Sequence, residues 1–68
     1  MIFVHTIETN AYRDDYERLR RDLPFSEGIV EIVVPEEGKE ERCRVIVNGN
    51  GADLRFIAAC LAKTGWLD

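Results

Sequence analysis

The stretch Asn48-Gly49-Asn50-Gly51 holds the residue types in this sequence that most suggest chemistry. It lies between an expected strand and an expected helix, and glycine-rich approaches to helix N-termini can bind anions through free backbone N–H groups. The stretch matches neither the G-x-G-x-x-G nor the Walker pattern, and Asp53 in the first helical turn would repel an anion. A tight turn is the favoured interpretation. An accessory domain that binds an anion or nucleotide through Gly49, Asn50 and Gly51 is the alternative.

A catalytic thiol is the second chemistry to consider, because His5 is the only histidine and Cys43 and Cys60 are the only cysteines. A thiol beside an imidazole can act as a nucleophile, but no orienting group or oxyanion site is identifiable. One histidine and two such cysteines do not have zinc-site spacing. Thiols on apolar elements are typically buried and unreactive. We therefore expect no enzyme activity, no metal and no cofactor, and leave open whether the cysteines pair.

The elements that position these residues follow from hydrophobic periodicity and from turn residues. A first helix is expected after Thr9 or Asn10 as N-cap, and Pro24 should end it at Leu23. Gly65 should follow the second helix as its C′ residue, and the tail after it could fold back over the core. The pattern predicts strands at 2–7, 29–34 and 42–48 and a second helix at 52–63.

The order β-α-β-β-α predicts one α+β domain spanning residues 1–68. The expected strand order is 1-3-2, with a hairpin loop of about five to seven residues between the second and third strands. A right-handed crossover that pairs the first strand in parallel would place both helices on one face. This topology resembles the ferredoxin-like fold without its last strand, a resemblance that implies no function.

Composition narrows the class of protein. Hydrophobic residues make up 46% of the 68 residues, which is typical of a globular chain. The net charge of −4 disfavours direct nucleic-acid binding and suits a protein partner with a basic surface. No apolar run is long enough for a membrane span, and no signal peptide is evident. We expect a cytoplasmic protein, in the host cytoplasm if it is viral.

Two helices cover only one face of a three-stranded sheet, so the other face should be open. Cys43, Val45 and Val47 are expected to face the helices. The open face is then expected to show an apolar patch with a polar rim, which is typical of a contact surface. The apolar set is Phe3, Ile7, Ile29, Val33 and Ile46, and the rim is His5, Glu31, Arg44 and Asn48.

Residues 2–7 form an edge strand in this topology, with few charges and no proline to discourage pairing. Either the tail at 64–68 covers this edge, or another chain adds to it. Pairing with another chain predicts a homodimer, through this edge or the open face, or β-augmentation by a different protein.

An acidic hairpin loop is the third candidate contact, formed by Glu36, Glu37, Glu40 and Glu41. Such a cluster could meet a basic groove, although solvation of a hairpin tip explains it equally well. The hypothesis is a non-catalytic protein–protein interaction module. A small acidic inhibitor, such as a phage-encoded anti-defence or anti-CRISPR protein, is an expectation from size and charge alone.

Overall fold

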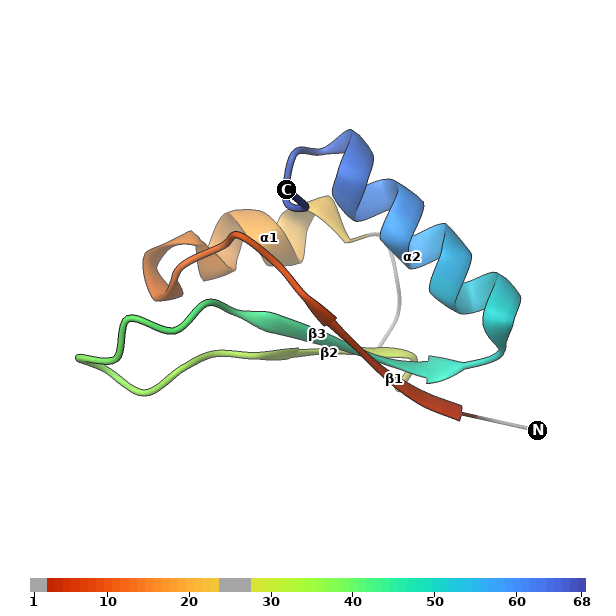
Figure 1. Cartoon of the computed structure of the whole chain (residues 1–68), viewed down its shortest axis with the longest axis horizontal. Coiled ribbons are helices and arrows are strands. Elements are labelled where there is room, and N and C mark those ends of the chain that lie inside the picture. Colours follow the sequence, from red (N-terminus) through yellow and green to blue (C-terminus); the bar gives the residue numbers. More distant parts are fainter. Residues whose placement is uncertain (1–2, 24–27) are drawn as a thin grey trace.

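The chain folds as a three-stranded sheet with two helices on one side, in a computed structural model that describes residues 3–23 and 28–68. The strands form one antiparallel sheet in the order β1-β3-β2, and Figure 1 shows both helices above it. The predicted α+β class and strand order are confirmed. The elements are β1 (Phe3–Glu8), the 3-10 turn η1 (Arg13–Asp15), α1 (Tyr16–Asp22), β2 (Val30–Val33), β3 (Arg44–Gly49) and α2 (Gly51–Lys63).

The expected parallel pairing of the first strand is wrong. β1 runs antiparallel to β3, from Phe3 opposite Gly49 to Glu8 opposite Arg44. Because β2 is also antiparallel to β3, β1 and β2 point the same way with β3 between them. The connection from β1 through α1 to β2 requires only that these two strands run in the same direction. In this split β-α-β arrangement, β3 lies between them.

The core lies between β3 and the helices. Cys43, Val45 and Val47 are fully buried, as predicted from the alternation of the third strand. Leu19 of α1 and, on α2, Ile57 and Leu61 close over them. Each such side chain contributes about 1.5–3 kcal/mol on burial, so this small cluster holds the sheet and both helices together.

Helical structure after β1 begins later than predicted, because the two expected N-cap residues make other contacts. The Thr9 hydroxyl donates to the Cys43 carbonyl at 2.8 Å, and Asn10 Nδ2 donates to the Gly65 carbonyl at 2.9 Å. The turn η1 instead starts where Asp15 Oδ2 accepts from the Tyr12 N–H at 2.9 Å. Pro24, the expected helix stop, lies outside the described residues.

The chain after α2 closes the helix layer as predicted. Gly65 has a φ of +89°, and its N–H donates to the Ala62 carbonyl, while that of Trp66 donates to the Leu61 carbonyl. This pair of bonds is a Schellman motif with glycine at C′. Trp66 is then buried, and its Nε1 donates to Asp22 Oδ2 at 2.7 Å, which joins the tail to α1.

The β2–β3 connection is longer than predicted and spans residues 34–43, because β2 ends at Val33 and β3 begins at Arg44. The Lys39 N–H donates to the Glu36 carbonyl at 3.1 Å, with Gly38 between them at a φ of +86°. A positive φ at that position is what a type II turn requires. The sequence placed the turn correctly and overestimated the strands that flank it.

Candidate interaction surfaces

The helix-covered side of β1 carries the residues that were expected on the open face. Val45 and Val47 of β3 face the helices, and Ile7 and His5 lie directly opposite them in the register. Residues directly opposite each other in an antiparallel pair share a face. The placement of Phe3, His5 and Ile7 on the open face is therefore wrong. Both faces of this strand contain apolar residues, so composition could not fix the register.

The open face is more polar than predicted. The placement of Glu31, Val33, Arg44, Ile46 and Asn48 on this face agrees with the register. From β1, however, the open face receives Val4, Thr6 and Glu8 in place of the expected residues. The apolar side chains on this face are therefore separated by polar ones. Ile46, for example, lies opposite Thr6 of β1 on one side and opposite Glu31 of β2 on the other. Among the described strand residues, the broad apolar patch expected here does not form.

The outer edge of β1 presents backbone groups that have no backbone partner among the described residues. The Asn48 N–H donates to the Ile29 carbonyl, toward β2, and the Thr9 N–H donates to the Cys43 carbonyl. Because hydrogen-bonding direction alternates along a strand, the odd residues of β1 bond to β3 and its even residues point outward. The β1 edge is defined here by the outward N–H and C=O groups of Val4, Thr6 and Glu8.

The C-terminal tail leaves the β1 edge uncovered. The Asn10 N–H donates to the Trp66 carbonyl at 2.9 Å, and Asn10 Nδ2 also reaches Asp68 Oδ1 at 3.2 Å. These contacts lie beyond Glu8, the last residue of β1. Within residues 3–23 and 28–68, β1 pairs only with β3. The alternative in which residues 64–68 cover this strand is therefore wrong for the described chain.

Exposed apolar side chains surround the N-terminal half of the β1 edge. Val4 is 68% exposed and Phe3 is 48% exposed. The Phe3 ring lies 6.1 Å from the His5 imidazole between ring centroids. The Nε2 atom of His5 is buried and has no hydrogen-bond partner among the described residues, which weakens the attachment of this half of the strand. The β1 edge is thus both open and apolar at its rim.

The glycine-rich junction before α2 is a helix cap. Asn50 Oδ1 accepts from the Asp53 N–H and Asp53 Oδ2 accepts from the Asn50 N–H, each at 3.0 Å. This is a capping box. A Cβ on Gly49 would lie 2.4 Å from Asp53 Oδ2, so glycine is required for that carboxylate to approach. An anion at Gly49, Asn50 and Gly51 would meet the Asp53 carboxylate, and the geometry disfavours it.

Cys43 does not have the surroundings of a nucleophile. Both thiols are free, and burial, followed by the charge of Asp15, raises the pKa of Cys43. A raised pKa leaves less thiolate, the reactive form. His5 lies opposite Val47 of β3, and Cys43 precedes Val47 by four residues, so His5 lies about 13 Å from Cys43 at the usual strand rise.

Among the described residues, no group of three or more His, Cys, Asp and Glu side chains could hold a metal ion.

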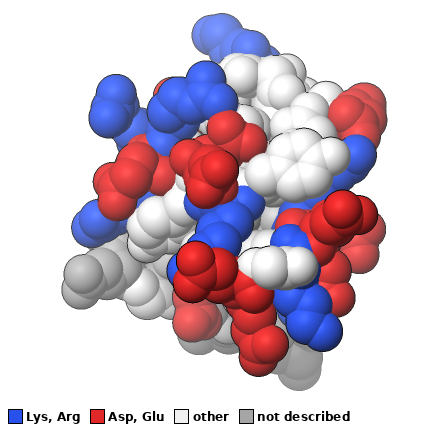
Figure 2. Space-filling view, turned by 90° about the vertical axis from the view of Figure 1, so that its left-hand side faces the viewer, with Lys and Arg blue, Asp and Glu red and all other residues white. Residues whose placement is uncertain are grey.

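The acidic hairpin is mixed with cations at the surface. Figure 2 shows the end of the molecule with the β2–β3 loop and the start of α1, where acidic and basic side chains alternate. Arg13 Nη1 donates to the Pro35 carbonyl at 2.8 Å and brings η1 against the loop. Glu36, Glu37, Glu40 and Glu41 are exposed. They form no single-sign field, so this surface favours a basic partner only weakly.

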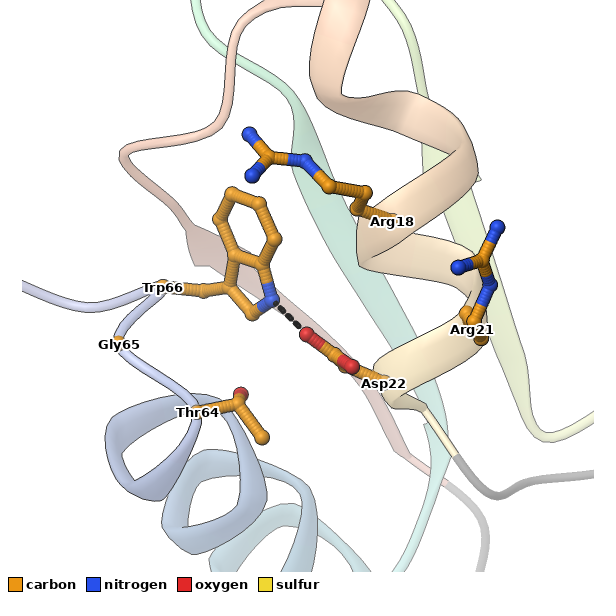
Figure 3. A pocket seen from close by; sticks show the side chains of 6 residues that line it. All are labelled: Arg18, Arg21, Asp22, Thr64, Gly65 and Trp66. Carbon is orange, nitrogen blue, oxygen red and sulfur yellow. Dashed lines mark hydrogen bonds between the residues drawn. The ribbon is translucent and has the colours of Figure 1, made fainter.

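A hollow of about 390 Å³ lies between the ends of the two helices (Figure 3). Arg18 stacks over the Trp66 ring, with its guanidinium carbon 5.5 Å from the ring centroid, and pairs with Asp15. Arg21 lies beside it and Asp22 accepts from Trp66. The C-termini of α1 and α2 both carry partial negative charge, so these arginines complement the helices. The sequence held no signal for this cluster, since Asp22 and Trp66 are far apart in the chain.

No family model matches the chain, and neither a curated protein nor a solved structure matches it. The truncated ferredoxin-like topology therefore stays a prediction, while the α+β architecture is a property of the structure itself. None of the helices in the described ranges is long and apolar enough to cross a membrane.

Proposed function

We propose that this chain is a non-catalytic protein–protein interaction module that binds a protein strand along the β1 edge. The observation that carries the proposal is the outward direction of the Val4, Thr6 and Glu8 backbone groups, with no described strand beside them. Such an edge is a template for strand addition, in which main-chain hydrogen bonds supply affinity and alternate side chains supply specificity.

Other features support this surface over the remaining candidates. The described strands place no continuous apolar patch on the open face, and the capping box of Asn50 and Asp53 leaves little room for an anion. The β1 edge instead combines free backbone groups with exposed Phe3 and Val4. An inhibitor that adds its β1 to a sheet of its target would use the same geometry.

Substitution of Thr6 tests the proposal with little change to the fold. Thr6→Pro removes one outward N–H and places a ring at the edge, yet leaves the β1–β3 hydrogen bonds intact, and proline is tolerated at such positions. Thr6→Ala keeps the N–H and serves as the matched control.

Both variants and the wild type would be used to capture proteins from the cells in which the chain is expressed. We expect a partner retained by the wild type and Thr6→Ala, lost with Thr6→Pro, and able to protect the Val4, Thr6 and Glu8 amides from hydrogen exchange. Equal capture by Thr6→Pro, or protection elsewhere, would contradict the proposal.

A further inference from the structure

We propose that the strand bound at the β1 edge is β1 of a second copy of this chain, joined antiparallel across a two-fold axis at Thr6. The two sheets would then form one continuous sheet. This inference rests on the proposed function, because it uses the same edge and names its occupant.

The outward groups of β1 are arranged symmetrically about Thr6. In an antiparallel pair centred there, Thr6 meets Thr6 of the second copy and Val4 meets Glu8. Every outward N–H then finds an outward C=O. A register centred on His5 would pair Val4 with Thr6 and set two imidazoles opposite each other. It would also place Glu8 past Phe3 of the second copy, where β1 has already ended. The register centred on Thr6 is therefore the one that uses the whole edge.

The side chains of β1 are compatible with the same register. On the open face, the exposed Val4 would lie beside the aliphatic part of Glu8 from the second copy. On the helix side, His5 would lie beside Ile7, which is only half-buried in one copy. The partner's Phe3 would come opposite Thr9, which lines a hollow of about 760 Å³ at the end of the strand. Pairing thus covers the apolar side chains that one copy leaves exposed.

The charges of β1 are compatible with a second copy at this edge. Glu8 is the only acidic residue of β1, and it faces Arg44 across its own sheet. The register brings no like charges directly opposite, which would be destabilising. The net charge of −4 on each copy still repels at longer range. Added salt screens that repulsion, so it should strengthen the dimer, whereas it would weaken binding to a basic partner.

Sedimentation equilibrium from low to high micromolar concentration tests the dimer. We expect a monomer–dimer equilibrium that tightens when salt is raised from about 50 mM to about 500 mM. Thr6→Pro should weaken dimerisation at least about tenfold, while Thr6→Ala should change it less than about threefold. Circular dichroism would confirm that each variant is folded. A wild type that stays monomeric throughout, or a dimer unaffected by Thr6→Pro, would overturn the inference.

Disulfide crosslinking tests the register without proline. Opposed Thr6 residues would have Cα atoms about 5.5 Å apart, within the range that a disulfide spans. In a Cys60→Ala background, Thr6→Cys should crosslink on mild oxidation, whereas Val4→Cys should not, because the two copies of residue 4 lie far apart. Crosslinking of Val4→Cys alone would overturn the register.

The two proposals can fail separately. A monomeric wild type without a Thr6→Cys crosslink overturns the second copy, yet capture of another protein that depends on Thr6 still supports the proposed function. A dimer that forms normally with Thr6→Pro, together with capture that ignores this variant, overturns both.

Discussion

The two edges of the sheet differ in how they are protected from pairing. β2 is short, covers Val30–Val33 and is soon followed by Pro35, whose carbonyl accepts from Arg13. β1 is longer, has no proline within Phe3–Glu8 and presents its outward groups beside exposed apolar side chains. Natural proteins usually blunt edge strands with charge, proline or brevity. This chain protects the β2 edge in these ways and leaves the β1 edge without them. The difference supports our proposal that β1 is the edge that binds a second strand.

The largest expected effect comes from moving a proline by one position along β1. The His5 amide bonds to β3, whereas the Thr6 amide points outward. His5→Pro should lower the free energy of unfolding by about 2–3 kcal/mol, because it breaks a sheet hydrogen bond and leaves a carbonyl of β3 unpaired. Thr6→Pro should lower it by less than about 1 kcal/mol. Urea denaturation measures both, and equal losses would contradict the assigned strand orientation.

At the opposite side of the sheet, Gly38 sets the turn that leads away from β2. Its φ of +86° is unfavourable for a residue with a Cβ, although nothing lies within 4 Å of that position. Gly38→Ala should therefore lower the free energy of unfolding by about 1 kcal/mol through backbone strain alone.

The matched control is Gly51→Ala in the first turn of α2, where φ is not positive. This variant should raise the free energy of unfolding by about 0.5 kcal/mol. Thermal unfolding of both variants separates them, and stabilisation by Gly38→Ala would show that the turn differs from the one described.

The smallest expected effect is a pH dependence from Asp15, which starts the turn that carries Arg13 to the β2 side. The hydrogen bond from the Tyr12 N–H, and then that from Arg18, lowers the pKa of Asp15 below its usual value of 3.8. Because the pKa of Asp15 is lower in the folded state, ionised Asp15 stabilises the fold fully at pH values above the unfolded-state pKa of 3.8. This stabilisation is lost as pH falls through the folded-state pKa.

Asp15→Asn removes that titration. Between about pH 5 and about pH 2.5, the wild type should lose slightly more stability than this variant in urea denaturation. Parallel loss in the two proteins would indicate that the Tyr12 and Arg18 contacts do not hold Asp15 in solution.

The sequence predicted the features of the fold that depend on local chemistry. The apolar alternation of the third strand identified Cys43, Val45 and Val47 as core residues. Glycine after the second helix identified its C-cap, because few other residues adopt a positive φ. The order of strands followed from connection lengths and handedness, which exclude most alternatives.

The sequence could not predict features set by partners distant in the chain. Thr9 and Asn10 have the side chains of N-caps, but Cys43 and Gly65 engage them instead. The faces of β1 depend on its register with β3, and a shift of one residue exchanges them. The sequence therefore identified β1 correctly as an edge strand, but it did not identify which residues of β1 lie on each face of the sheet.

Amide hydrogen exchange along β1, measured by NMR at low and high protein concentration, tests the central claim most directly. At low concentration, we expect fast exchange at Val4, Thr6 and Glu8 and slow exchange at His5 and Ile7, because only the odd residues bond to β3. At high concentration, the even residues should become protected. Even residues whose exchange stays fast at every concentration and with any captured partner would contradict the account, as would slow exchange at those residues in the dilute monomer.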